Sequence, residues 1–174
     1  EAGGITQAIG AYQVVKDGKT MQDFPIERLY RDARVVTIYE GTSQMQVVAA
    51  MKYVSGGILS AHIGQLIAEA PQDHPHRAAY DRLAPLAVRY EKLIGDTTAE
   101  GEVCVEYHAR RLVECGAMLL MALLLIAEAD DTRSTRSMNH FLLMTEALFA
   151  EHEHSIRTLR AAEIENLMQE DIEV

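Results

Sequence analysis

The stretch Phe24–Gln46, FPIERLYRDARVVTIYEGTSQMQ, combines a helix start with a short extended run. Asp23 and Pro25 are typical of a first helical turn, because a carboxylate caps free N–H groups and proline has no N–H to leave unpaired. Apolar residues then recur at helical spacing on one face. The run Val35–Tyr39 that follows is apolar and extended. The first half of the stretch therefore predicts an amphipathic helix that leads into a turn.

The second half of the stretch predicts a bend followed by a new helix. Gly41 permits a sharp change of backbone direction. Ser43 and Gln46 have the spacing of a capping box, which is typical of a helix start. Glu40 thus lies at a bend, beside a helix N-terminus. A carboxylate there can serve as a cap or dipole partner, or it can be a rigidly held general base.

The composition of the whole chain favours an all-α protein. Its 174 residues include 4 prolines and no tryptophan, while leucine, alanine, methionine and glutamate are abundant. There is no long strand pattern, repeat or low-complexity tract. We predict a helical bundle of about six or seven helices. Beyond the stretch above, helices are expected at residues 1–18, 43–54, 58–70, 76–94, 97–130 and 138–163.

Local signals set these expected boundaries. Gly56–Gly57 is a break, and Gly95–Asp96 marks the end of the helix over 76–94. Thr97-x-x-Glu100 has capping-box spacing and predicts the start of the next helix. The polar segment Thr132–Ser137 separates the last two helices. The acidic tail, Glu165–Val174, is expected to be frayed or bound to a partner.

The most apolar run is Leu112–Ala127, LVECGAMLLMALLLIA. A membrane span needs about twenty apolar residues, and carboxylates bracket this run at Glu114 and Glu128. An apolar helix of this kind fits best as the central member of the bundle, covered by its neighbours. The alternative is a surface that docks on a membrane. We predict the central position and expect no membrane association.

Charge and cysteine content restrict the partners and the compartment. The net charge of −10 argues against nucleic acid and anionic membranes, which need basic patches. Cys104 and Cys115 lie eleven residues apart on one expected helix, about 16 Å along its axis, too far for a disulfide. Buried thiols in a reducing compartment are expected. We predict a cytoplasmic protein, with the mitochondrial matrix left open.

The stretch closely resembles the C-terminal signature of the acyl-CoA dehydrogenases. In that family a segment P-x-E-R-x-Y-R-D-A leads into I-Y-E-G-T-S-x-x-Q, and this chain reads PIERLYRDA and IYEGTSQMQ at the same places. The resemblance covers roughly residues 5–55. It implies an oxidoreductase that removes a proton and a hydride from the Cα–Cβ bond of an acyl-CoA, with FAD as the hydride acceptor.

The resemblance assigns roles to individual residues. Glu40 is implied to be the base that removes the α-proton. Tyr39 and Gly41 would border the thioester of the substrate. Thr42 and Gln44 match family positions that contact FAD.

A second element near the N-terminus resembles the family's Q-x-x-G-G, which approaches the adenine end of FAD across a subunit interface. Here it comprises Gln7 and Gly10, with Ala11 at the second glycine. The distance from Gln7 to Phe24 is also about six residues longer than in the family. An adenine contact and a plain helix–loop segment therefore both remain open.

We predict two parts in the chain. Residues 1–56 would be the end of the dehydrogenase C-terminal helical domain, and residues 57–174 an added helical extension. The family's N-terminal and middle domains are absent, so we expect a longer polypeptide or a second chain to supply them. On its own the chain is expected to be inactive.

The resemblance also implies partners: acyl-CoA as substrate, an electron-transfer flavoprotein as acceptor and further copies in a homo-oligomer. The alternative function is a non-catalytic interaction or oligomerisation module that keeps the motif as scaffold. We expect no metal site. The sequence Glu151–His154 alternates glutamate and histidine, but adjacent helical residues do not face one another, and His152 is expected in the core.

Overall fold

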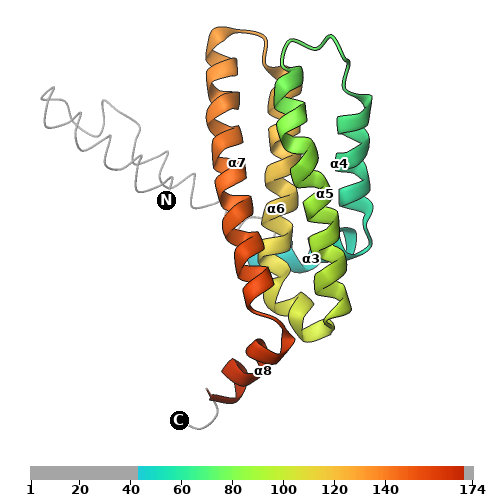
Figure 1. Ribbon diagram of the computed structural model, residues 1–174, viewed down its shortest axis with the longest axis vertical. Coiled ribbons are helices and arrows are strands. Elements are labelled where there is room, and N and C mark those ends of the chain that lie inside the picture. The colour runs from blue at the N-terminus through green and yellow to red at the C-terminus, as the bar shows by residue number, and fades with distance from the viewer. Residues whose placement is uncertain (1–42, 171–174) are drawn as a thin grey trace, which may run out of the picture. The chain divides into compact units, whose positions relative to one another are not determined.

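The computed structural model describes residues 43–170, with side chains as far as residue 167. All six elements in this part of the chain are α-helices, which confirms the all-α prediction. Figure 1 shows α4 to α7 running side by side along the long axis, with α8 beyond the lower end of α7. The helices are α3 (Ser43–Ser55), α4 (Ile58–Glu69), α5 (Arg77–Ala99), α6 (Glu102–Glu128), α7 (Thr132–Thr158) and α8 (Ala161–Glu170).

The chain divides into two compact units, residues 1–46 and 47–174. In the second unit α6 is the central helix, because it packs against α4, α5, α7 and α8. The run Leu112–Ala127 lies within α6, and its inner face is fully buried. The predicted central position is therefore confirmed. The predicted covering on all sides is wrong, since Met121 and Leu124 are exposed.

A close approach at Gly116 lets α6 lie against two neighbours at once. A Cβ added there would lie 2.6 Å from Leu59 Cδ2 of α4 and would also overlap the Tyr90 hydroxyl of α5. That hydroxyl donates a hydrogen bond to the backbone carbonyl of Leu112, at 3.0 Å. A buried phenol therefore has its polar atom satisfied where the helices are closest.

The predicted boundary between α5 and α6 is wrong. The helix does not end at Gly95–Asp96 but continues to Ala99. Thr97 does not cap α6, because its hydroxyl donates back to the carbonyl of Leu93, at 2.7 Å, inside α5. Thr98 does the same with Ile94. A threonine hydroxyl can cap the N-terminus of a following helix or donate to a carbonyl one turn back in its own helix. The buried hydroxyl of Thr97 makes the second kind of bond.

The boundaries of α7 also differ from those expected. Thr132–Ser137 is the first part of α7 and not a linker, because Asp131 caps the helix in a reciprocal pair with Ser134. The helix ends at Thr158 and does not reach residue 163. The first residues of the acidic tail that begins at Glu165 belong to α8 and are not frayed. The fully buried side chain of Ile164 holds α8 against the bundle. Residues 171–174 lie outside the described part.

None of the helices in the described part combines the length and apolar character that crossing a bilayer requires.

Candidate functional site

The predicted catalytic segment ends where the described residues begin. Glu40 lies outside the described residues. So do five of the six residues predicted to contact substrate or FAD, namely Gln7, Gly10, Tyr39, Gly41 and Thr42. Gln44 is the exception, and it is exposed in the first turn of α3. The helix already includes Ser43, so the residue predicted as its cap is its first member.

The N-terminus of α3 follows directly after the predicted catalytic motif in the sequence. Its first turn contains no acidic side chain, and its only basic residue in the last turn is Lys52. The first N–H groups of a helix lack partners within the helix and carry a partial positive charge. This helix start follows Glu40 by three residues. Gln44 is exposed in the first turn of the helix that begins three residues after the predicted base in the sequence.

Ion pairs in the bundle itself are structural. Glu153 of α7 is largely buried and accepts hydrogen bonds from Arg89 of α5 and from Arg157 one turn on. The bond to Arg89 is the main cause that lowers the pKa of this carboxyl. Arg82 and Glu146 form a second, bidentate pair between α5 and α7, at 2.9 Å. Both pairs join the same two helices, and an arginine engages the carboxylate in each of them.

A further polar cluster fixes the corner between α7 and α8. Glu100, at the end of α5, accepts hydrogen bonds from the Arg160 guanidinium and from the Ala161 backbone N–H, the latter at 3.4 Å. His108 of α6 is fully buried, and its Nε2–H donates to the Leu159 carbonyl at 2.7 Å. Its Nδ1 has no partner among the described residues. Burial is the main cause that lowers the pKa of His108.

Sequence reasoning missed this cluster, because its members come from three helices that are far apart along the chain. The local sequence points to a different role for Glu100, because Thr97-x-x-Glu100 has the spacing of a capping box for α6. In the structure Glu100 instead accepts a hydrogen bond from the backbone N–H of Ala161, the first residue of α8, 61 residues away. A histidine on an apolar helix face, such as His108, is the other clue, since a buried imidazole requires a hydrogen-bond partner.

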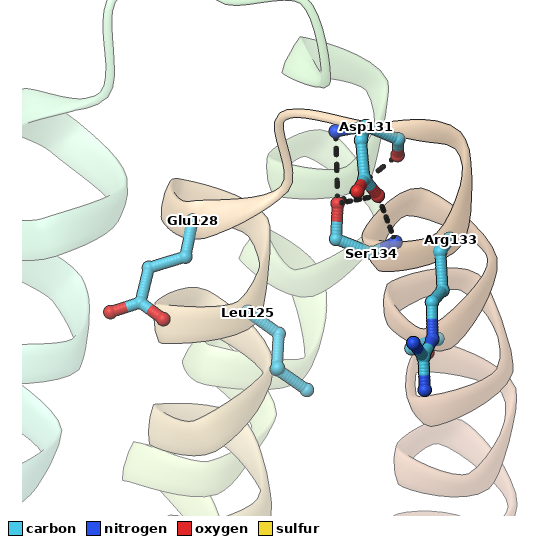
Figure 2. Close-up of a pocket in the computed structure, with 6 residues that line it drawn as sticks. Leu125, Glu128, Asp131, Arg133 and Ser134 are labelled. Carbon is cyan, nitrogen blue, oxygen red and sulfur yellow. Dashed lines mark hydrogen bonds between the residues drawn. The ribbon is translucent and has the colours of Figure 1, made fainter.

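A cavity of about 310 Å³ lies at the turn between α6 and α7. Figure 2 shows its lining residues, with Asp131 and Ser134 turned toward each other and Glu128 on the other side. The Ser134 N–H donates to the Asp131 carboxylate at 2.6 Å, and the Asp131 N–H donates to the Ser134 hydroxyl at 3.0 Å. The Asp131 and Ser134 groups thus bond each other and cap α7.

The predictions about histidine and cysteine concern other parts of the bundle. His152 is mostly buried, as predicted, and its Nε2–H donates to Glu114 of α6 at 2.9 Å. Within residues 43–170 no group of three or more potential metal ligands gathers. Cys104 and Cys115 are buried and free, as predicted. Burial raises the pKa of the Cys115 thiol to about 12, which leaves it almost entirely protonated.

Comparison with known families divides the chain into two matched segments. Residues 4–54 match the model described as "Acyl-CoA dehydrogenase, C-terminal domain". Residues 58–164, more than half of the chain, match "Acyl-CoA dehydrogenase C terminal". The first segment includes the predicted catalytic stretch and most of α3, and the second includes α4 to α7.

Individual relatives match stretches of the chain that differ in length. An acyl-CoA dehydrogenase of Bacillus subtilis is 43% identical over 53 residues, which are 30% of this chain and 14% of that protein. An acryloyl-CoA reductase (NADH) of Anaerotignum propionicum is 50% identical over 34 residues, 20% of this chain and 9% of that protein. Translation initiation factor IF-2 of Streptococcus pneumoniae is 25% identical over 169 residues, 91% of this chain and 18% of that protein.

The chain thus spans less than a fifth of the length of these curated relatives. No solved structure matches it. The similarity to the initiation factor is too low to indicate a shared family, whereas the two family models together account for nearly the whole chain with the same assignment. The all-helical bundle and the two matched segments agree, and the chain belongs to the acyl-CoA dehydrogenase family.

Proposed function

We propose that this chain is the C-terminal part of an FAD-dependent acyl-CoA dehydrogenase and that Glu40 is its catalytic base. The observation that carries the proposal is the family match over residues 4–54, which includes Tyr39-Glu40-Gly41-Thr42. A helical scaffold needs no carboxylate at this bend. The start of α3 at Ser43 adds support, because the motif predicts a helix directly after Glu40-Gly41-Thr42.

In the proposed reaction Glu40 removes the proton from Cα of the acyl thioester. The β-hydrogen leaves as a hydride, and a Cα=Cβ double bond conjugated with the thioester remains. Bound FAD supplies the acceptor for that hydride. Glu40 keeps the proton as a neutral carboxylic acid until it is released, so atoms and charge balance. Tyr39 and Gly41 would border the thioester and orient Cα toward the carboxylate.

The described residues fit an anionic cofactor group. The first turn of α3 carries no acidic side chain to repel a phosphate, and Gln44 is exposed there. We propose that Thr42 and Gln44 hold FAD at this helix start. Gln7 and Gly10 would hold its adenine end, although Ala11 in place of the family's second glycine allows less close backbone approach.

The remaining parts of the site are proposed to come from elsewhere. The family's N-terminal and middle domains, on the same polypeptide or a partner chain, would complete the flavin and acyl pockets. The reduced flavin would pass its electrons to an electron-transfer flavoprotein. We propose a homo-oligomer at least as large as a dimer, with each FAD contacted by two copies near Gln7 and Gln44, and a cytoplasmic location.

The proposal is tested in the full-length enzyme by Glu40→Gln, which keeps the shape of the side chain but removes its basicity. We expect FAD and acyl-CoA to bind normally while turnover with an artificial acceptor falls by about 10²–10⁴-fold. Glu91→Gln, which makes the same change at an exposed position of α5, is the matched control. A fall of less than tenfold for Glu40→Gln, with both ligands bound, contradicts the assignment.

A second candidate is the reverse reaction, reduction of an enoyl-CoA. The similarity to an acryloyl-CoA reductase over 34 residues favours it, since the same Cα–Cβ bond is then the reacting group. Assays with acyl-CoA plus an electron acceptor and with enoyl-CoA plus NADH distinguish the two directions. Faster turnover in the second assay identifies a reductase, and Glu40 would then handle the same proton in the opposite direction.

A further inference from the structure

The short helix α8 is attached to the bundle at one place. It packs against α6 and against no other helix in the described part of the chain, and Figure 1 shows it beyond the lower end of α7. Within residues 161–167 only the side chain of Ile164 is buried. Ile164 and Cys104 of α6 are buried but lie outside the main hydrophobic core, to which Cys115 belongs. A small contact of this kind can open locally while the core stays folded.

Hydrogen bonds from two other helices hold the connection between α7 and α8. Glu100, the C-cap of α5, accepts from the Arg160 guanidinium and from the first backbone N–H of α8. The Arg160 backbone N–H donates to Glu163 of α8 at 3.1 Å. From α6, the Nε2–H of His108 donates to the Leu159 carbonyl at 2.7 Å. The direction in which α8 leaves α7 therefore depends on groups of α5 and α6.

His108 suits this corner only as a neutral imidazole. Its Nε2 keeps a proton because the Leu159 carbonyl accepts a hydrogen bond from it, while its buried Nδ1 has no partner among the described residues. A second proton would make Nδ1 a buried donor without an acceptor and would give the ring a positive charge. Arg111 and Arg160 both oppose that charge. Protonation therefore disfavours the closed corner.

The other charged groups around the corner do not compensate. Glu100 is engaged by the cation and the backbone of the connection, as described above. Asp96 of α5 pairs with Arg157 of α7, at 3.7 Å. On α6 itself the ring of Tyr107 lies edge-on to the imidazole of His108, with 5.0 Å between the ring centroids. None of these side chains bonds Nδ1 in the described part of the chain.

We propose that α8 is a pH-sensitive latch, which docks on α6 while His108 is neutral and leaves α6 when His108 takes a second proton. In the open state water can hydrate the imidazolium, and the Ile164 side chain leaves its buried position. Cys104 lies one turn before His108 on the same face of α6, so opening also uncovers this thiol. The latch belongs to the helical bundle and does not depend on the dehydrogenase reaction.

The direction of the pH effect follows from the two states of the imidazole. Burial lowers the pKa of His108 when α8 is docked, and hydration returns it to about 6.5 when α8 has left. Docking is therefore strongest above pH 7, and the ratio of open to docked chains rises by up to about tenfold for each pH unit below 6.5. The pKa of Glu100 is lowered by its hydrogen bond to Arg160, so this carboxylate stays charged in the same range.

The two cysteines report local and global opening separately in the 174-residue chain. Their labelling by dithiodipyridine is followed by mass spectrometry and expressed as a protection factor, the rate in the urea-unfolded chain divided by the rate in the folded chain at the same pH. We expect Cys104 to be protected at least about tenfold less than Cys115 at pH 7.5. Its protection should fall about three- to tenfold further at pH 5.5. Equal protection of both thiols, or a Cys104 factor constant within twofold, overturns the proposal.

His108→Gln tests the source of the pH dependence. Glutamine keeps a donor for the Leu159 carbonyl but takes up no proton, so Cys104 should have the same protection factor at pH 7.5 and 5.5. His62→Gln, at an exposed position of α4, is the matched control and should keep the wild-type pH dependence. A wild-type pH dependence in His108→Gln contradicts the assignment of the latch to this imidazole.

Ile164→Asp tests whether α8 is the cover. A carboxylate at the buried anchor should keep α8 open at both pH values, so Cys104 should be labelled nearly as fast as in the unfolded chain while Cys115 stays protected. Leu167→Asp, at a 45% exposed position of α8, is the matched control and should keep the wild-type protection of Cys104. If Ile164→Asp also removes the protection of Cys115, α8 does not open separately from the bundle and the proposal is wrong. Unchanged protection of Cys104 in Ile164→Asp contradicts it as well.

Discussion

Single residues decide how closely the helices of this bundle approach one another. Gly116 gives α6 room to contact Leu59 of α4 and Tyr90 of α5 at the same level. The buried hydroxyl of Tyr90 is satisfied by the Leu112 carbonyl, and burial raises the pKa of this phenol well above its usual value. Glycine in a helix interior costs about 1 kcal/mol relative to alanine, so the close packing must offset that cost.

Gly116→Ala should therefore destabilise the bundle, although alanine is the better helix former. The added methyl overlaps Leu59 and Tyr90, and overpacking of this kind costs about 1–3 kcal/mol. The control is Gly64→Ala in α4, where an added Cβ meets no atom within 4 Å. That change should stabilise the chain by about 0.5–1 kcal/mol. Urea unfolding measures both, and a stabilised Gly116→Ala would contradict the close approach.

His108 should make stability depend on pH near neutrality. Its pKa is lowered in the folded chain by burial, and the unfolded imidazole titrates near pH 6.5. Between these two pKa values the unfolded chain binds a proton that the folded chain does not, so stability falls as pH drops below about 6.5. The carboxyls with lowered pKa, such as Glu153, lose their contributions only below about pH 4.5.

The measurement for His108 is urea unfolding at pH 7.5, 6.5 and 5.5 for the wild type and for His108→Gln. Glutamine keeps a donor for the Leu159 carbonyl but does not titrate. The wild type should lose more stability than the variant on acidification, while His62→Gln, at an exposed position of α4, should behave like the wild type. Equal pH dependence in the wild type and His108→Gln would show that the buried imidazole does not control this range.

At the scale of elements, periodicity predicted the helices well and their ends poorly. The apolar spacing of α6 and α7 depends on burial against neighbours, and burial leaves a regular pattern in the sequence. The ends of the helices depend on whether a polar side chain bonds within its own helix or caps another one. Thr97 and Glu100 have capping-box spacing, yet Thr97 bonds within α5 and Glu100 caps α8. That choice is made by tertiary contacts that local sequence does not contain.

Two adjacent leucines of α6 test the orientation of this central helix. Leu123 is 3% exposed and Leu124 is 51% exposed. Leu123→Asp buries an unpaired carboxylate and removes core packing, so we expect the bundle to unfold. Leu124→Asp should retain the wild-type helix content and cooperative melting. Circular dichroism compares them.

Liposome flotation of the same variants tests the rival function of α6, a membrane-docking surface. We expect the folded wild-type chain to stay with the soluble fraction. If the wild type floats, while Leu124→Asp is folded and does not float, then the exposed side of α6 binds lipid, which contradicts the expectation of no membrane association.

At the scale of the whole molecule, the described part is a helical bundle, and the proposed chemistry belongs to residues that precede it in the sequence. The family match over residues 58–164 covers most of the bundle, in which ion pairs such as Arg82–Glu146 and the cap at Asp131 join or end the helices. The sequence motif around Glu40 indicates the reaction without any of this structure. Of the predicted site residues only Gln44 is described, so the geometry of the others stays a prediction.

The 174-residue chain alone should not retain FAD. The proposed contacts through Gln44 and the start of α3 hold one part of the cofactor, and the missing domains would form most of the pocket. Gel filtration after incubation with FAD, monitored at the flavin absorbance, measures retention. Stoichiometric FAD in the protein peak would show that this chain forms a complete flavin site.

The most direct test of the account is exchange of the substrate's α-hydrogen in D2O, catalysed by the full-length enzyme under anaerobic conditions without an electron acceptor. Exchange requires only the base and a positioned thioester, so it isolates the role of Glu40 from electron transfer. The account predicts that the wild type exchanges the α-hydrogen of bound acyl-CoA, and that Glu40→Gln slows this exchange by at least about 10²-fold while acyl-CoA still binds. Exchange by Glu40→Gln within tenfold of the wild-type rate would show that another group removes the proton.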